Sequence, residues 1–336
     1  MKKFLLKLLL FISIFISIFA LMFSVSTFLP PTPRTSKSLL FAKTNKDSLL
    51  QNIPPPRIIF IGGSNLSFGL NSKMIKDSLS LNPINTGIHG NIGLIYMMDN
   101  TLPYIKSSDI VVVSPEYQQF YGTTAYGKAE LLRTIIDVSP STMSMLRIKQ
   151  WANIIKYLPG FAITKFKPTE YFNLEESISF EERVVYSVNS FNEYGDVYTH
   201  WNLEKRNFPP DDSIDLEFNY SVINELSNFK NKLAEKGAVL FITFPGYQSA
   251  SFENNRAQIM RIETELKEKG FVLLGTPDKY KIPESLMFNT TYHLSKKGVD
   301  YKTQLLIEDL KNALVAKQTL SSKQIIQQDA ARHSDN

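Results

Sequence analysis

Four short runs of apolar, mostly β-branched residues constrain the fold of this chain more than any other feature. Runs this apolar are typical of strands that are buried on both faces of a sheet. Longer segments with helical spacing separate the runs, so a parallel sheet covered by helices is expected. The four predicted strands are Ile58–Ile61, Ile110–Val113, Ala238–Ile242 and Phe271–Leu274.

Two helices between these strands can be placed from the spacing of their apolar residues. Tyr220–Lys236 and Asn255–Lys269 carry apolar side chains at steps of three and four, and Gly237 and Gly270 follow them. Each helix leads into a strand, which is the order of βαβ units. The pattern therefore predicts an α/β fold in the form of a three-layer α/β/α sandwich.

The N-terminal segment is long and apolar enough to cross a bilayer. Leu8–Phe23 carries no charge, and a helix over Phe4–Phe28 reaches across a bilayer at about 1.5 Å per residue. Lysines precede it, so the positive-inside rule places the N-terminus in the cytoplasm and the chain after Pro30 outside. The alternative is a cleaved signal peptide, with Ser24 and Ser26 as the small residues before the cut. Both interpretations export the rest of the chain.

Composition divides the exported part into four segments. Prolines at both ends of residues 30–56 indicate an extended linker. A single domain is expected over residues 57–315, interrupted at residues 122–215 by an aromatic-rich, mostly helical insertion that covers the strand ends. We expect its aromatic side chains to form the core of this cap, with ligand stacking as the alternative. Residues 316–336 predict a disordered tail.

Charge and residue usage exclude several classes of protein. The net charge is +5, but three of the lysines lie at the membrane end, so no basic surface for a nucleic acid is expected. The chain has no cysteine, which excludes disulfides and thiolate catalysis. Its 4 histidines are scattered and there is no phosphate-binding loop. We therefore expect no metal, no cofactor and no nucleic-acid partner.

A serine follows the first predicted strand. Gly62 and Gly63 allow a tight turn and a close approach to a ligand, and Ser64 then stands at the carboxyl end of the strand, where ligands bind in parallel sheets. If a helix begins here, the N–H groups of Ser64 and Asn65 point into the site and can stabilise an oxyanion. A plain connection from strand to helix is the alternative.

A histidine follows the last predicted strand. His293 precedes a helix, so it lies on the same edge of the sheet as Ser64. Neutral histidine is the side chain best suited to take a proton from a serine hydroxyl near neutral pH. Either residue alone has a structural interpretation, but the two positions together predict a shared site.

The sequence segments that carry Ser64 and His293 resemble the conserved sequence blocks of the SGNH (GDSL-like) hydrolase superfamily. The resemblance covers residues 57–122 and 238–314. The resemblance implies a flavodoxin-like, five-stranded parallel sheet. It also implies that Ser64 is the nucleophile and gives one oxyanion N–H, that Gly90 in the block Asn85–Gly90 gives another, and that His293 is the base.

The chain departs from the family pattern at three places. Gly63 stands where the family has aspartate. Gln118 stands at the place of the family's asparagine and is expected to donate an amide bond to the oxyanion. Asn289 stands at the place of the aspartate that orients the histidine, and its amide oxygen can hold the ring but cannot offset imidazolium charge. Glu284 or Asp300 is the alternative partner.

The resemblance implies an extracytoplasmic, membrane-anchored serine acyl-ester hydrolase or O-acyltransferase. Its substrate would be an acylated small molecule or an acylated cell-envelope or exported glycan. Asn65 and Glu116 are expected to bind substrate, and a carboxylate that holds loop backbone is the other interpretation of Glu116. The main alternative is a catalytically weak or inactive SGNH-like protein that binds a glycan or a protein. A third is an unrelated α/β protein in which Ser64 and His293 do not meet.

Overall fold

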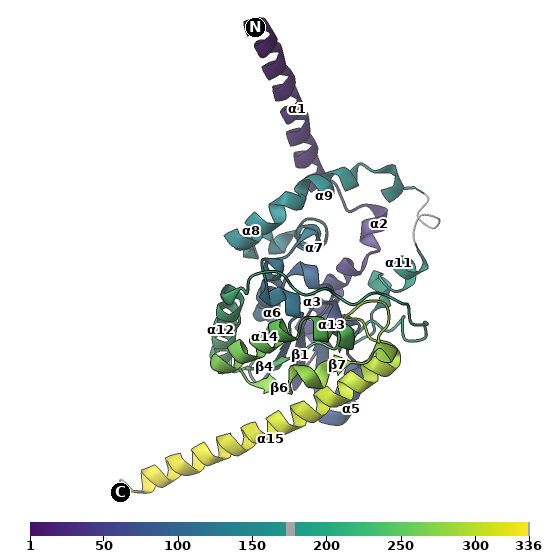
Figure 1. The fold of residues 1–336 in the computed structure, drawn as a ribbon. Coiled ribbons are helices and arrows are strands. Elements are labelled where there is room, and N and C mark those ends of the chain that lie inside the picture. Colours follow the sequence, from purple (N-terminus) through teal and green to yellow (C-terminus); the bar gives the residue numbers. More distant parts are fainter. Residues whose placement is uncertain (173–178, 335–336) are drawn as a thin grey trace.

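A five-stranded parallel sheet forms the centre of the domain in a computed structural model, which describes residues 1–172 and 179–334 (Figure 1). The strand order is β2-β1-β3-β4-β6, and all neighbouring strands are parallel. The predicted α/β class with a parallel sheet is thus confirmed. The strands are β1 (Arg57–Gly62), β2 (Asn82–Asn85), β3 (Ile110–Ser114), β4 (Val239–Thr243) and β6 (Leu273–Leu274); β5 (Tyr247–Gln248) and β7 (Lys281–Ile282) form a separate pair.

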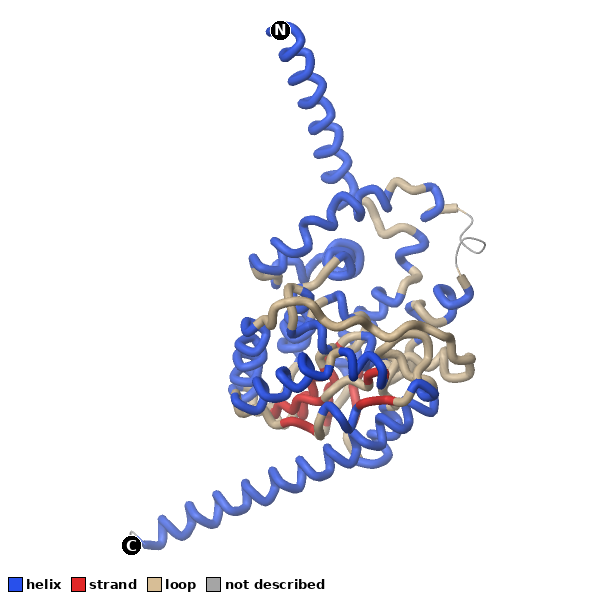
Figure 2. Tube along the Cα trace, in the orientation of Figure 1, coloured by secondary structure: helices blue, strands red, loops and turns tan. Residues whose placement is uncertain are grey.

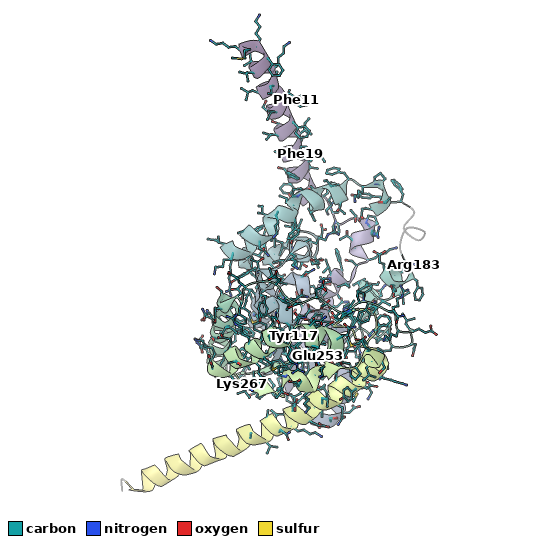
Figure 3. All side chains as sticks on the ribbon, viewed as in Figure 1. Phe11, Phe19, Tyr117, Arg183, Glu253 and Lys267 are labelled. Carbon is teal, nitrogen blue, oxygen red and sulfur yellow. The ribbon has the colours of Figure 1, made fainter. Side chains whose placement is uncertain are left out.

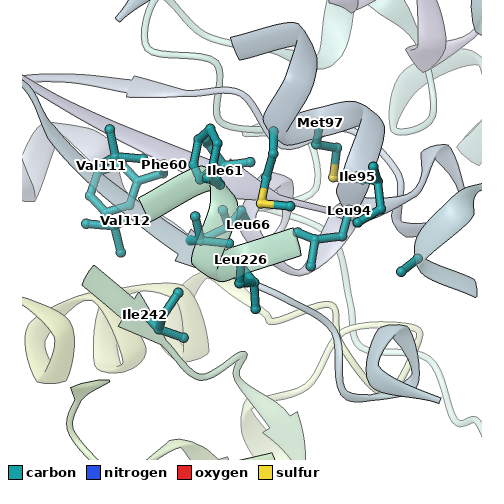
Figure 4. Packing of buried hydrophobic residues seen from close by; sticks show 14 of the residues in the cluster. Phe60, Ile61, Leu66, Leu94, Ile95, Met97, Val111, Val112, Leu226 and Ile242 are labelled. Atoms are coloured by element: carbon teal, nitrogen blue, oxygen red, sulfur yellow. The ribbon is translucent and has the colours of Figure 1, made fainter. Parts of the chain in front are cut away.

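The hydrophobic core lies around the central strands (Figure 4). Phe60 of β1 and Val112 of β3 are completely buried, as is Leu226 from a helix packed beside β4. Helices pack against β1, β2, β4 and β6, and residues 111–113 of β3 between them are buried, so the apolar runs are shielded from water. The helices of this region are α3 (Ala42–Asn52), α4 (Ser64–Ser67), α5 (Ser72–Leu79), α6 (Leu94–Thr101), α12 (Tyr220–Glu235), α13 (Ser249–Asn254), α14 (Arg256–Glu268) and α15 (Lys296–Ser334).

The N-terminal helix α1 (Lys2–Phe28) projects from the domain as a single rod (Figure 1). It is long and apolar enough to cross a membrane, and its apolar window is not buried in the protein. The segment predicted as an extended linker is instead largely helical. It contains α2 (Pro33–Ser36), the 3₁₀ turn η1 (Leu39–Phe41) and α3, and the side chains of Leu40 and Leu50 are part of the core.

The insertion lies between α1 and the sheet as a set of short helices, seen as blue segments in Figure 2. They are α7 (Ala129–Arg133), the π-helical turn η6 (Thr134–Val138), η7 (Pro140–Met145), α8 (Ile148–Ile154), η8 (Ile155–Tyr157), α9 (Leu158–Lys165), η9 (Pro168–Glu170), α11 (Phe180–Val184) and η10 (Val188–Ser190). At the other end of the chain, α15 continues to Ser334, so the segment predicted as a disordered tail is helical up to that residue. Residues 335–336 lie outside the described residues.

Short 3₁₀ turns complete the connections between strands and helices. Those nearest the carboxyl ends of β2 and β3 carry residues of the candidate site, because strand ends of a parallel sheet meet at one edge. The turns are η2 (Gly90–Ile92), η3 (Leu102–Tyr104), η4 (Tyr117–Phe120), η5 (Thr124–Tyr126), η11 (Pro277–Tyr280) and η12 (Glu284–Leu286).

Candidate active site

Ser64 is the first residue of a short helix directly after β1. Gly63 forms the turn between them, and a Cβ on Gly63 would come within 2.8 Å of the Gly90 nitrogen, so a larger residue does not fit this approach. The serine side chain lines a pocket of about 570 Å³. The predicted strand, turn and helix around the serine are therefore present.

Asn65 holds this turn against the neighbouring strand. Its Oδ1 accepts a hydrogen bond from the Gly63 N–H at 3.0 Å, and its Nδ2 donates to the backbone oxygen and the hydroxyl of Ser114 at 3.1 and 3.0 Å. The side chain is buried and does not line the pocket. Asn65 was predicted to bind substrate, but its side chain holds the serine turn in place.

His293 lines the same pocket as Ser64, although the two residues come from opposite ends of the domain's sequence. Asn289 Oδ1 lies 3.0 Å from the ring Nδ1 of His293, which makes Nδ1–H the donor and leaves Nε2 to accept a proton. Phe68 stacks on the ring with centroids 4.0 Å apart and planes 10° from parallel. The imidazole is thus fixed by one polar and one aromatic neighbour.

Tyr186 brings the insertion into contact with this histidine. Its hydroxyl accepts a hydrogen bond from Asn289 Nδ2 at 2.8 Å and lies 3.4 Å from His293 Nδ1. Sequence reasoning missed Tyr186 because an isolated tyrosine in an aromatic-rich segment carries no spacing signal. Tyr186 is brought next to His293 only by the path that the chain takes through the insertion.

The pKa of His293 lies well below its usual value. Burial is the main cause, because a charged imidazolium would lose its hydration, and His200 and His89 add a smaller effect of the same sign. The imidazole is therefore neutral at neutral pH, which is the form that a general base needs.

Glu284 and Asp300 do not replace the missing aspartate. Glu284 accepts a hydrogen bond from Gln248, and Asp300 is paired with Lys296 and accepts from Asn71. Within the described residues, neither carboxylate contacts His293. Asn289 is the residue that holds the ring.

Glu116 lies where an oxyanion would be expected. Its Oε1 accepts from the Ser64 hydroxyl and from the Asn65 N–H, both at 3.4 Å, and its carboxylate packs against Gly63 and Gly90. Burial raises the pKa of Glu116, an effect that His89 and these hydrogen bonds oppose. The carboxylate accepts a hydrogen bond from loop backbone and also lines the pocket, and its contact with a substrate stays a prediction.

The Ser64 hydroxyl donates to Glu116 and not to the histidine. In the part of the chain that the structure describes, no hydrogen bond joins Ser64 to His293, although both face the pocket. Attack by Ser64 would thus require its hydroxyl to rotate from Glu116 toward the His293 ring.

The amide that reaches the Gly90 turn belongs to Gln119. Its Nε2 donates to the Gly90 oxygen at 3.0 Å and its Oε1 accepts from the Glu116 N–H at 3.1 Å. Gln118, predicted as an oxyanion donor, is exposed at the pocket wall. No hydrogen bond from the Gly90 N–H is found among the described residues, and Gly90 lines the pocket. The η4 turn directs Gln119 inward and leaves Gln118 at the pocket wall, so the role of Gln118 as an oxyanion donor stays a prediction.

Carboxylates dominate the charge of the pocket lining. Glu116 lies beside Ser64, and Asp211 and Asp212 contribute from the end of the insertion. Asp211 Oδ2 accepts hydrogen bonds from Tyr247 at 2.8 Å and Thr291 at 2.9 Å. No lysine or arginine is among the described lining residues. The electrostatic field of such a pocket favours neutral or positively charged ligands.

Comparison with known proteins identifies no family for this chain. No family model matches the chain, and a search of curated proteins finds no significant match. Among the described residues, no group of histidine, aspartate and glutamate side chains has the geometry of a metal site.

Proposed function

We propose that this protein is a serine acyl-ester hydrolase or O-acyltransferase of the SGNH type, held at a membrane by α1 with its domain outside the cytoplasm. The single observation that carries the proposal is that Ser64 and His293 face one pocket while Asn289 holds the ring by Nδ1. The strand order is consistent with the flavodoxin-like, three-layer arrangement of that superfamily. The lysines in the first turns of α1, Lys2, Lys3 and Lys7, support the outward orientation.

The reaction begins with attack of Ser64 Oγ on the ester carbonyl carbon. The hydroxyl proton passes to His293 Nε2, and the carbonyl oxygen becomes an oxyanion that the N–H groups of Ser64 and Gly90 stabilise, with Gln118 at the pocket wall as a third donor. Collapse of the intermediate breaks the bond to the leaving alcohol, which takes the proton from His293. Water or a sugar hydroxyl then attacks the acyl-serine by the same route and releases the acyl group.

The pocket supports an acylated small molecule or glycan as substrate. Its volume of about 570 Å³ is in the range of small-molecule sites. Tyr186 and Tyr247 offer aromatic surface, and Thr290 and Asn91 offer polar groups. The three carboxylates oppose an anionic acyl group, because the described part of the lining has no lysine or arginine to offset it.

The direct test is covalent labelling of the full chain with a fluorophosphonate, which reacts with activated serines. Wild type should be labelled and should turn over short-chain esters, and Ser64→Ala should lose both. Ser67→Ala is the matched control, because Ser67 lies in the same helix but its hydroxyl is buried and donates to the Ile88 oxygen. Labelling that persists in Ser64→Ala contradicts the proposal.

One observation favours a second candidate function, a non-catalytic protein that binds a glycan. The carboxylate of Glu116 occupies the position in front of the Asn65 N–H and takes the hydrogen bond of the Ser64 hydroxyl, so it would repel a developing oxyanion. If this candidate is correct, neither wild type nor Glu116→Gln reacts with the fluorophosphonate. Reaction of Glu116→Gln alone would mean that the machinery is intact and that the carboxylate suppresses it.

A further inference from the structure

A stripe of exposed apolar side chains runs along the outer side of α8, η8 and α9. Its members recur at steps of three or four, which is one face of a helix. Ile148 is 87% exposed, Ile155 56%, Ile163 48% and Phe166 45%, whereas Phe161 on the opposite side is buried. A helix surrounded by water normally presents polar side chains on such a face. We call this set the insertion stripe: Ile148, Ala152, Ile155, Pro159, Ile163 and Phe166.

The insertion stripe lies beside the end of α1. Helix α9 packs against α1, and Figure 1 shows α8 and α9 running across its C-terminal end. Lys165 of α9 fixes this contact. Its Nζ donates to the backbone oxygens of Leu29 and Pro30 at 3.3 and 2.9 Å and forms a buried ion pair with Asp137 at 2.5 Å. The stripe is therefore held at the level at which α1 ends.

Helix α1 is exposed and makes no contact with the domain over most of its length. Figure 3 shows Phe11 and Phe19 on a segment of α1 that stands clear of the domain, and Ser26 near its end is its only buried residue. Its 27 residues reach about 40 Å, compared with about 30 Å for the apolar part of a bilayer. If α1 crosses the membrane, its C-terminal end and α9 lie at the interface between lipid and water.

Basic residues flank the insertion stripe. Lys149, Lys156 and Lys167 are exposed, and no acidic residue occurs from Ile148 to Thr169. An apolar face with lysines along its borders is the pattern of a helix that lies in the membrane interface, where the apolar side chains enter lipid and the amines meet the headgroups.

We propose that the insertion stripe rests on the surface of the bilayer that α1 crosses, so the domain contacts lipid at two places. The proposal assumes that α1 spans the membrane and does not depend on the chemistry of Ser64. Lipid is the occupant because the stripe is continuous with the exit point of α1 and carries only positive charge at its borders. A second copy would bring the same lysines together.

The test uses single cysteines, which the chain permits because it has none of its own. Ile155→Cys, Ile163→Cys and Phe166→Cys are labelled with an environment-sensitive fluorophore in the full chain, reconstituted in phosphatidylcholine and phosphatidylglycerol vesicles. Their emission should rise and shift to the blue, and brominated lipids should quench it. Val272→Cys is the matched control, because Val272 is 51% exposed next to β6 and should show none of these changes.

Phe15→Cys in α1 separates the possible failures. Stripe labels that behave like Val272 while the Phe15 label is quenched overturn the proposal. Stripe labels that are shielded but not quenched by brominated lipids also overturn it, because a protein surface then covers the stripe. A Phe15 label that is not quenched shows that α1 does not span the bilayer, and the proposal fails at its premise. None of these outcomes depends on whether Ser64 reacts with a fluorophosphonate.

Discussion

The Asn289 side chain connects the candidate base to the insertion. Its Oδ1 accepts from His293 Nδ1 and its Nδ2 donates to the Tyr186 hydroxyl. An amide can hold the ring in this way but has no charge to offset the imidazolium that forms when Ser64 loses its proton. A substitution at this position can therefore add a charge to the ring's partner while keeping the hydrogen bond that holds the ring.

Replacing Asn289 by aspartate should increase activity. A carboxylate would keep the contact with His293, accept from Tyr186 and stabilise the imidazolium, so we expect Asn289→Asp to raise kcat by about tenfold or more. The measurement is turnover of a short-chain ester. Asn289→Leu, which removes both hydrogen bonds, should lower kcat. A tenfold loss in Asn289→Asp would show that Asn289 does not occupy the place of the acid.

The pH profile should show the lowered pKa of His293. Since burial disfavours the charged ring, the neutral base persists below pH 6.5, and kcat/KM should fall only as the pH drops through the lowered pKa of His293. The acid limb of kcat/KM should therefore have its midpoint below 6.5. Glu116→Gln is the control, because it removes the carboxylate that accepts from the Ser64 hydroxyl and should keep this limb. A midpoint at or above 6.5 contradicts the prediction.

Among the elements that the sequence analysis did not predict, β2 and α3 were missed for different physical reasons. Strand β2 reads Asn-Pro-Ile-Asn and lies at the edge of the sheet, where proline and polar residues are tolerated, so it lacks the apolar run that marks the other strands. Helix α3 contains several polar residues but packs against β2 and η1. Lys46 in α3 is buried and donates to the Asn85 and Gly195 oxygens at 2.9 and 2.6 Å. A lysine side chain is normally exposed to solvent, so the lysines of α3 gave no sign in the sequence that this helix is buried.

The contact between α9 and the rest of the insertion should depend on the buried ion pair of Lys165 and Asp137. Both side chains are 2% exposed. Lys165→Met leaves a buried carboxylate without its partner, and we expect a loss of about 3–5 kcal/mol in the free energy of unfolding. The measurement is denaturant unfolding of the full chain in detergent.

A double variant and a surface pair test that explanation. Lys165→Met combined with Asp137→Leu removes both charges and should recover much of the lost stability. Lys73→Met, which breaks the exposed pair of Lys73 and Asp77, should have no measurable effect. Equal losses in the single and double variants would mean that packing of the lysine stem, rather than charge, stabilises α9.

At the scale of the whole molecule, the insertion and the sheet edge together set the charge of the pocket. Glu116 comes from the end of β3, and Asp211 and Asp212 come from the end of the insertion. The three carboxylates face one space, and the described part of the lining has no lysine or arginine. The combined field acts on any charged substrate that enters.

Esters should be selected by the charge of their acyl group. We expect kcat/KM to fall by about tenfold or more from a neutral acyl ester to an anionic one of similar size, because the anion meets uncompensated carboxylates. An ester with an ammonium group should be at least as reactive as the neutral one. The comparison uses nitrophenyl esters and should weaken at high salt. An anionic ester that reacts as fast as the neutral one contradicts the prediction.

The sequence by itself determined the parallel sheet, the apolar N-terminal helix, the position of Ser64 at the end of β1 and the position of His293 shortly before the last helix. These are local signals, because apolar runs, charges and turns are read within a few residues. Only the tertiary structure decided that Gln119 and not Gln118 faces Gly90, and that Tyr186 reaches Asn289. It also decided that the Glu116 carboxylate contacts the Ser64 hydroxyl. Those contacts join segments far apart in the chain, and their distances depend on how the insertion packs over the sheet.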